Sequence, residues 1–267
     1  MVRAELKAKA KSQIKGNIGK LFLIGLVEFA VLLPFIVMLF ASLSSFMNEI
    51  ALATMAGVEL TAVPSLGIWF WIGLVGMALL VPALVLGYSK LYLGLTRGET
   101  PTVGGLFKGF SSFGKALWLD LIASFFILLW FGIPCIVGFF LTAQGSILIL
   151  AGSVAAGVIL SILGIILLIA SLVILIIKLL AYCQINWILA DNPNVTAWQA
   201  FKSSVAMMKG HKWEAFVLDL SFLGWILLGI LTAGILFIWL TPYINATYAN
   251  YYLALKGKNA PSAAIEQ

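Results

Sequence analysis

The sequence predicts an all-α, polytopic membrane protein with six transmembrane helices and amphipathic interfacial helices on the cytoplasmic face. Of its 267 residues, 63% are hydrophobic and only 10% are charged, whereas a soluble domain is about half apolar and about a quarter charged. The apolar residues form runs long enough to cross a bilayer, and the basic residues gather beside those runs. This composition excludes a soluble globular domain, a disordered chain, a collagen-like rod and a disulfide-rich secreted module.

The first predicted element is a basic amphipathic segment at residues 1–20, which we expect on the cytoplasmic side of the membrane. An apolar run follows at 21–47. A helix rises about 1.5 Å per residue, so about 20 residues cross the hydrocarbon core of a bilayer. Because this run exceeds the roughly 7–15 apolar residues of a signal peptide, we expect it to be retained as the first transmembrane helix.

Two further crossings are expected at 66–95 and 116–141. Trp69 and Trp71 open the first of these runs, and tryptophan favours the membrane–water interface. Between the two runs, residues 97–115 are rich in glycine and basic residues, which is typical of a cytoplasmic loop.

The apolar stretch at 147–189 is compatible with one very long helix or with two short ones. If every long run crosses once, the basic segments at 1–20, 90–115 and 202–212 all lie on one side, as the positive-inside rule requires. Two short helices would place the lysines of the last segment outside. We therefore predict a single, tilted fourth helix.

The last long stretch, 213–255, is expected to contain two crossings, because a continuous helix of this length would measure about 64 Å, twice the bilayer core. We place these helices at 213–230 and 234–255, joined by a tight outer turn. Residues 21–255 then form a single six-helix domain, and residues 256–267 form a cytoplasmic tail.

The distribution of charge predicts the orientation of the chain. Every basic residue except Lys178 lies in a segment assigned to the cytoplasm, whereas the outer loops carry Glu49 and Glu59 and no basic residue. Both termini are therefore expected in the cytoplasm, where the basic patches would attract anionic lipids of the bilayer. No recognition fold or basic–aromatic groove accompanies the charge, so we expect no nucleic-acid partner.

Three segments share a pattern of an amphipathic stretch, an elbow of glycine and lysine, and an apolar helix that carries one acid. The acids are Glu28, Asp120 and Asp219. An ionisable residue inside a membrane is costly and is a functional candidate by default. If the three carboxylates face one another, a shared proton or a cation would relieve their repulsion. Alternatively, each acid pairs with a neighbouring lysine or a helix N-terminus.

The last predicted crossing carries an unusual number of polar groups, in the sequence TPYINATYANYY. Pro242 is expected to kink this helix. Asn245 and Tyr248 lie three residues apart and share one face, which we expect to look into the helix bundle. This face is a candidate polar site, either for hydrogen bonds between helices or for a ligand pocket.

The elbow before the fifth crossing, formed by Lys209, His211, Lys212 and Trp213, is a candidate interfacial site at the level of the lipid headgroups. The chain has one histidine and no HExxH motif, so a zinc enzyme is not expected. A role for His211 as a general base with Asp219 is the alternative.

Several other residues predict structure rather than chemistry. Cys135 and Cys183 form no CxxC pair, so we expect neither a metal site nor a cofactor. Asp191 precedes a turn with Pro193, which stops the fourth helix. Thr196 is then placed to cap a short amphipathic helix that lies in the membrane interface.

Small residues in the fourth predicted helix favour close contact between helices. Gly152, Ala156 and Gly164 approximate the small-xxx-small pattern. They allow a membrane-protein partner or a homo-oligomer.

The motifs LADNP, KGHKW and TPYINATY resemble those of a family of mostly Gram-positive bacterial integral membrane proteins that is catalogued only as a domain of unknown function. The N-terminal RAELKAKAKSQIKGNIGK is similar to the start of the same family. More distantly, the chain resembles the membrane domain attached to some glycerophosphodiester phosphodiesterases, which is not their catalytic part. The resemblance implies a six-helix type of protein in a bacterial plasma membrane, and it implies no reaction.

From these features we expect a non-enzymatic integral membrane protein that binds a partner protein, a lipid or a small solute. No nucleophile–base pair or metal cluster accompanies the abundant interfacial segments. The alternative is a small-solute or ion transporter or channel that uses Glu28, Asp120 and Asp219. An intramembrane lipid enzyme centred on His211 and Asp219 is a third hypothesis.

Overall fold

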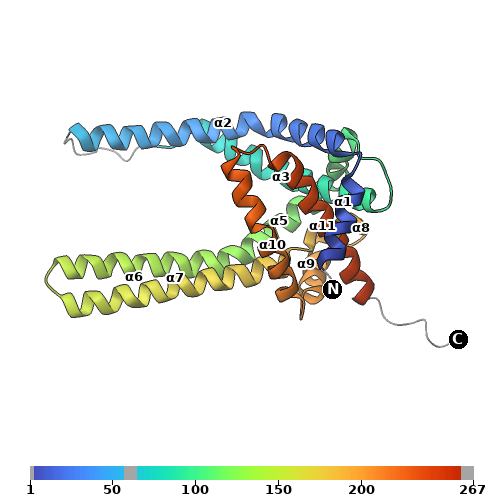
Figure 1. The fold of residues 1–267 in the computed structure, drawn as a ribbon. Helices are drawn as coiled ribbons and strands as arrows, with labels where there is room; N and C mark the ends of the chain where they lie inside the picture. Colours follow the sequence, from blue (N-terminus) through green and yellow to red (C-terminus); the bar gives the residue numbers. More distant parts are fainter. Residues whose placement is uncertain (1–2, 57–64, 260–267) are drawn as a thin grey trace. The chain divides into compact units, whose positions relative to one another are not determined.

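The computed structural model describes residues 3–56 and 65–259, and the regular elements within these ranges are all helical. The fold class is therefore all-α, as the sequence predicts. Figure 1 shows the helices in chain order: α1 (Arg3–Ile14), α2 (Ile18–Ala56), α3 (Gly67–Thr96), α4 (Val103–Phe107), the 3-10 helix η1 (Lys108–Ser112), α5 (Phe113–Ile127), the π-helix η2 (Leu128–Gly132), α6 (Ile133–Leu150), α7 (Val154–Tyr182), α8 (Ile185–Asp191), α9 (Ala197–Met207), α10 (Lys212–Leu231) and α11 (Phe237–Asn259).

In the described part of the chain, five helical stretches are long and apolar enough to cross a membrane: Ile18–Ala56, Gly67–Thr96, Val103–Leu150, Val154–Asp191 and Lys212–Leu231. This is the pattern of a multi-pass membrane protein. The sixth expected crossing, 234–255, falls on α11, which is not one of the five. Its polar residues and its two terminal lysines, Lys256 and Lys258, lower its hydropathy. Glu59, expected in an outer loop, lies outside the described residues.

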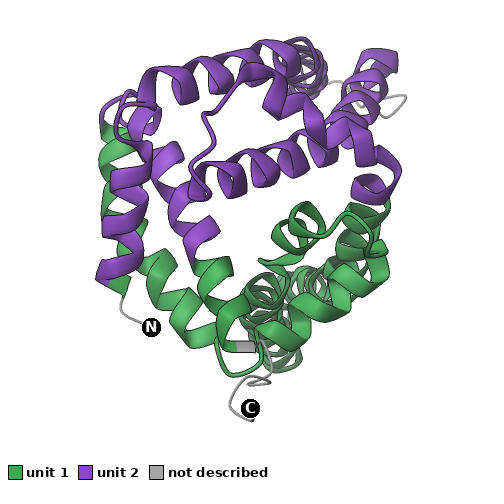
Figure 2. Cartoon of the chain, turned by 90° about the vertical axis from the view of Figure 1, so that its right-hand side faces the viewer, with its two compact units in different colours: residues 1–3, 118–231, 251–267 green, residues 4–117, 232–250 purple. Residues whose placement is uncertain are grey.

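Helix packing divides the chain into two compact units, coloured separately in Figure 2. Unit 1 comprises residues 1–3, 118–231 and 251–267, and unit 2 comprises residues 4–117 and 232–250. The sequence predicts one membrane domain, because a uniformly apolar composition carries no information on which helices pack together.

In unit 2, glycines allow α3 to approach its neighbours closely. A Cβ atom added to Gly76 would lie 2.1 Å from the Phe35 ring of α2. Nearer the other end of α3, a Cβ on Gly87 would lie 1.7 Å from the Leu106 carbonyl oxygen, and one on Gly109 would lie 1.8 Å from the Ala83 carbonyl oxygen. A side chain at Gly76 would collide with the Phe35 ring, and one at Gly87 or Gly109 would collide with backbone. These glycines therefore allow α2 and the 103–112 segment to pack closely against α3.

Unit 1 contains a long antiparallel hairpin of α6 and α7, which lie side by side in Figure 1. The helices touch through small residues. A Cβ on Gly145 would lie 2.6 Å from the Gly157 carbonyl oxygen, and one on Gly164 would lie 2.7 Å from the Gly138 carbonyl oxygen. Such contacts bring helix backbones together in a membrane. Gly164, expected to favour helix contact, is thus used within the chain, whereas Ala156 is exposed.

The reversal of this hairpin differs in position from the expected boundary between the third and fourth crossings. That boundary is expected between residues 141 and 147, whereas the chain turns at 151–153. Gly152 provides the turn with φ +89°, a conformation that glycine adopts at low cost. Residues 147–150 therefore belong to α6 rather than to the fourth crossing.

Local signals around the end of the fourth crossing predict the structure well. The predicted single fourth helix is instead divided by a turn at residues 183–184 into α7 and α8. α8 ends at Asp191, and Thr196 caps α9, as expected. The Thr196 hydroxyl accepts a hydrogen bond from the Gln199 backbone N–H at 3.2 Å, and the Gln199 side-chain oxygen accepts one from the Thr196 N–H at 2.9 Å. This is a capping box, which satisfies two N–H groups that the first turn of a helix leaves free.

Candidate functional site

A cavity of about 590 Å³ lies in unit 2, bordered by α2, α3 and α11. This volume falls within the range of small-molecule sites, roughly 300–1,000 Å³. Polar side chains reach its lining from Glu28, Tyr88, Tyr92 and Thr241. The other lining residues are apolar side chains, glycines and one proline: Leu21, Phe22, Gly25, Leu26, Phe29, Leu32, Ile36, Gly234, Phe237, Ile238 and Pro242. We call this cavity the Glu28 pocket.

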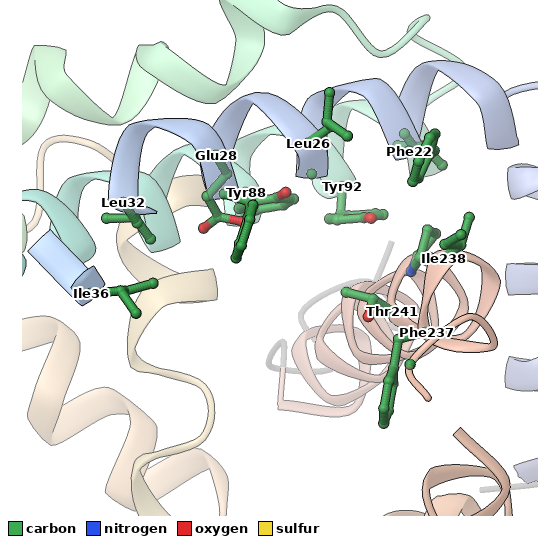
Figure 3. Close-up of a pocket in the computed structure, with 15 residues that line it drawn as sticks. Phe22, Leu26, Glu28, Leu32, Ile36, Tyr88, Tyr92, Phe237, Ile238 and Thr241 are labelled. Carbon is green, nitrogen blue, oxygen red and sulfur yellow. The ribbon is translucent and has the colours of Figure 1, made fainter. Parts of the chain in front are cut away.

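The Glu28 pocket is open because α11 crosses α2 and α3 instead of running alongside them. In Figure 3, α2 runs across the view, whereas α11 is seen close to end-on and presents Phe237, Ile238 and Thr241. Helices that cross steeply touch over a short length and diverge on either side. Side chains from three helices therefore surround the space without filling it.

Two tyrosines of α3 form one wall of the pocket. Tyr88 and Tyr92 are four residues apart and so lie on the same face of the helix. Their rings stack with centroids 6.0 Å apart and planes inclined by 14°. Tyr92 is buried and Tyr88 is half-buried, so this wall is held rigid while the outer ring stays accessible from the pocket.

Glu28 supplies the one carboxyl group among the described residues that line the pocket. Its side chain is half-buried and is hydrogen-bonded with the Tyr88 hydroxyl, and Figure 3 shows the two groups together. Glu28 lies ten residues after the start of α2, about 15 Å along the helix axis. Among the described lining residues, none is a lysine, arginine or histidine. Within this described lining, the Glu28 carboxyl group therefore has a hydrogen-bond partner in Tyr88 but no basic partner.

The polar face predicted on α11 lies next to the pocket rather than in it. Thr241 and Pro242 line the cavity, whereas Asn245 and Tyr248 do not. The Asn245 amide donates a hydrogen bond to the Thr241 carbonyl oxygen at 3.0 Å, within its own helix. Both Asn245 and Tyr248 are half-buried, which agrees with a packing role for this face.

The other two predicted acids lie in unit 1, on its surface. Asp120 and Asp219 are both exposed, and each lies seven residues after the start of its helix, about 10 Å along the axis. Within the described ranges, neither carboxylate forms an ion pair. The Asp219 carboxyl group lies within electrostatic range of Cys183 and Tyr251. The acids of the repeated pattern thus occupy different environments, and Glu28 lies deepest along its helix.

A second cavity, of about 550 Å³, lies in unit 1 at the elbow between α9 and α10. Lys202 and Val205 of α9 form one side, and Lys209, Lys212 and Trp213 form the other. Gly210 makes the sharp turn between the helices with φ +84°. Three of the four residues predicted at this elbow therefore line a groove, which we call the lysine groove.

His211, the fourth predicted elbow residue, faces Glu214 instead of the lysine groove. Its Nδ1 atom lies 3.3 Å from Oε2 of Glu214, and its backbone carbonyl accepts a hydrogen bond from the Tyr251 hydroxyl at 3.2 Å. These contacts tie the elbow to α11. The pairing with Asp219 that a general base would require is replaced here by the contact with Glu214.

Sequence reasoning overlooked the two tyrosines that accompany Glu28. Tyr88 and Tyr92 lie in an apolar run that predicts a transmembrane helix and no binding site. Their spacing of four residues, with two hydroxyl groups on one helix face, is a detectable signal. Nothing in the sequence, however, indicates that this face meets Glu28, because that contact depends on how α2 packs against α3.

The profile of the family described as "Protein of unknown function (DUF975)" matches residues 1–259. The chain belongs to this family. The comparison with curated proteins found no match, and neither did the comparison with solved structures. The resemblance seen in the sequence motifs is thus confirmed at the level of the family. A bacterial source and the distant similarity to phosphodiesterase-associated domains stay predictions.

In this DUF975 protein, the C-terminal part of α11 joins two of the motifs that carry the resemblance. The carboxylate of Asp191, in LADNP, is 3% exposed and accepts hydrogen bonds from the Tyr252 hydroxyl at 2.9 Å and from Lys256 Nζ at 2.5 Å. The Tyr251 hydroxyl reaches His211, in KGHKW, through the bond described above. These contacts account for the two motifs structurally, because they anchor the C-terminal part of α11.

Proposed function

We propose that this protein is a non-enzymatic integral membrane protein that binds a small organic cation with an apolar body in the Glu28 pocket. The observation that carries the proposal is an acidic side chain, without a basic partner among the described lining residues, in an otherwise apolar and aromatic cavity. A ligand that brought a positive charge would compensate this carboxylate, and its apolar body would fill the remaining space.

The chemistry of the lining supports a cation over other ligands. Aromatic rings attract cations through their electron-rich faces, and Phe22, Phe29, Tyr88 and Tyr92 supply such rings. An anion would be repelled by Glu28. A neutral apolar ligand would leave the carboxylate in a dry environment without a counter-charge, which is costly.

Binding of tetraphenylphosphonium to the purified protein in detergent tests this proposal. The expected result is saturable binding that Glu28→Gln weakens by roughly tenfold or more, because the substitution removes the charge and keeps the shape. Glu49→Gln is the matched control: it makes the same change on the same helix, at an exposed residue outside the pocket. Tetraphenylborate, an anion of the same shape, should not compete.

Two outcomes would overturn the proposal. Equal binding to the wild-type protein and to Glu28→Gln would remove the role of the carboxylate. Competition by tetraphenylborate as strong as that by unlabelled tetraphenylphosphonium would show that the pocket selects apolar bulk alone, as an acyl chain would.

Transport of the cation is the second candidate, and the depth of Glu28 favours it. The carboxylate lies about 15 Å along α2, half the thickness of a hydrocarbon core, and transporters hold their substrates near this depth. Uptake of tetraphenylphosphonium into proteoliposomes is the discriminating measurement. Transport predicts accumulation of the cation that Glu28→Gln abolishes and Glu49→Gln does not. Binding without uptake would contradict transport and support a protein that only binds the cation.

We further propose six crossings, with α11 as the sixth, in a bacterial plasma membrane with both termini in the cytoplasm. The 23 residues of α11 measure about 35 Å, enough for one crossing. Because α11 crosses α2 steeply (Figure 3), the two would be tilted differently in the bilayer. Labelling of single cysteines near the two termini with an impermeant reagent tests the topology: both should be protected in intact cells and labelled after lysis.

A further inference from the structure

The lysine groove of unit 1 combines three basic side chains with an open space. Lys202 and Lys209 are exposed, Lys212 is half-buried, and all three line a volume of about 550 Å³. Lys202 lies on α9, whereas Lys209 and Lys212 follow it by seven and ten residues, in the turn and at the start of α10. The charges therefore come from both sides of the elbow. The groove is therefore a concave surface of one sign rather than a row of charges on one helix face.

The positive charge of the groove is not compensated by carboxylates. Within the described ranges, none of the three lysines forms an ion pair, and the Nζ atom of Lys202 lies 5.2 Å from the centroid of the Trp198 ring. The nearest acid in sequence, Glu214, is occupied elsewhere: it contacts His211 and interacts electrostatically with Lys258. An anion would thus meet about three unneutralised charges in the groove.

Trp213 shows what kind of anion fits. Its side chain borders the groove and is 72% exposed, and it stands at the second residue of α10, an apolar helix long enough to cross a membrane. Tryptophan in this position is typical of the level of lipid headgroups. An anion that binds here would lie beside the lipid tails that surround α10. This position matches a phosphate group joined to acyl chains.

We propose that the lysine groove binds the headgroup phosphate of an anionic phospholipid, with Trp213 against the glycerol and upper acyl region. The first turn of α10 adds backbone N–H groups and the positive end of a helix dipole on the same side. The proposal is independent of the Glu28 pocket, because it concerns other residues, another unit and a ligand of opposite charge.

Native mass spectrometry of the detergent-purified protein, titrated with phosphatidylglycerol or with phosphatidylcholine, tests the proposal. The expected result is a phosphatidylglycerol adduct that the triple variant Lys202→Gln, Lys209→Gln and Lys212→Gln weakens by roughly a hundredfold, since each lysine near a membrane surface contributes about a fivefold factor. Phosphatidylcholine, whose headgroup has no net charge, should bind weakly to both proteins.

The matched control removes the same charge elsewhere. Lys9, Lys11 and Lys15 are exposed on or just after α1, and their joint replacement by glutamine should leave the adduct in place. Equal loss in both triple variants would overturn the proposal, because binding would then follow net charge alone. If the groove triple variant elutes as an aggregate, the single variants Lys209→Gln and Lys212→Gln replace it, each with an expected loss of about fivefold.

Competition with inorganic phosphate separates the two sources of the anion. The lipid proposal predicts that millimolar inorganic phosphate leaves the phosphatidylglycerol adduct intact, because the acyl region contributes to binding. Displacement of the lipid by free phosphate at that concentration would overturn the proposal in favour of a soluble phosphate ligand.

Discussion

The Glu28 pocket and the lysine groove are similar in volume and opposite in chemistry. The Glu28 pocket is formed by the sides of three helices and contains one carboxylate among apolar and aromatic side chains. The lysine groove is formed at a helix elbow and contains three amines beside an exposed tryptophan. The comparison shows how a chain with few charges can separate them by sign. One acid inside an apolar helix, Glu28, faces a cavity, and three lysines around the start of another apolar helix line a groove.

The largest effect is expected from replacing the acid of the Glu28 pocket with a positively charged side chain, as in the lysine groove. Glu28→Lys should reduce tetraphenylphosphonium binding by about a hundredfold or more, because attraction becomes repulsion in a partly buried site. The same variant should bind tetraphenylborate. Competition binding with both ions measures this change in preference from cation to anion, and Glu49→Lys serves as the control on the same helix. Unchanged cation binding in Glu28→Lys would show that the charge at residue 28 does not contribute to binding.

A steric change should affect the Glu28 pocket alone. A Cβ atom at Gly25 would lie 3.7 Å from the Tyr88 hydroxyl oxygen, an ordinary contact, so Gly25→Ala should bind tetraphenylphosphonium within about twofold of the wild type. Gly25→Leu projects further into the cavity and should weaken binding roughly tenfold. Isothermal titration of both variants measures the difference. Full binding by Gly25→Leu would place the ligand elsewhere.

Salt should distinguish the two regions by a smaller factor. Exposed charges are screened when the Debye length shortens, whereas partly buried ones are screened much less. Between about 0.05 M and 0.5 M sodium chloride, we expect phosphatidylglycerol binding at the lysine groove to fall roughly fivefold and cation binding at Glu28 to fall less than about twofold. Parallel titrations at the two ionic strengths test this. Equal salt dependence would contradict the difference in burial.

The smallest effect is expected from the hydroxyl that accompanies Glu28. Tyr88→Phe removes the hydrogen bond that orients the carboxylate, so tetraphenylphosphonium binding should weaken about threefold, as is usual for one hydrogen bond. Tyr92→Phe keeps the same ring stack and should change binding less, because the Tyr92 hydroxyl is not the hydrogen-bond partner of Glu28. Equal losses in the two variants would assign the effect to the tyrosine wall as a whole.

Local signals in the sequence predicted individual elements with success. Thr196 caps α9, and Asp191 ends α8, because capping and turn preferences act over a few neighbouring residues. The hairpin turn at Gly152 was missed, since it lies inside a continuous apolar run where periodicity gives no boundary. Five of the expected crossings have counterparts among the described helices, whereas the crossing expected at α11 stays a prediction.

The candidate site was predicted in part. Glu28 was singled out as a costly intramembrane charge, and it does line a cavity. Its grouping with Asp120, Asp219, Asn245 and Tyr248 was based on their polarity and spacing. Asn245 instead bonds within its own helix, and the two aspartates lie on the surface of unit 1. Helical spacing shows which residues share a face, but it does not show which helix that face meets.

The sequence by itself determined that the surroundings of this protein are mostly lipid, that it is helical, and where its charges are concentrated. These properties follow from composition and from interactions between near neighbours in the chain. Only the tertiary structure decided that Glu28 meets Tyr88, that the lysines of α9, α10 and the turn between them line one groove, and that Asp191 bonds to α11. Those contacts depend on the close approach of backbones at glycines and on the angles at which helices cross. Apolar side chains are compatible with many such arrangements, and the packing of the whole chain selects one of them.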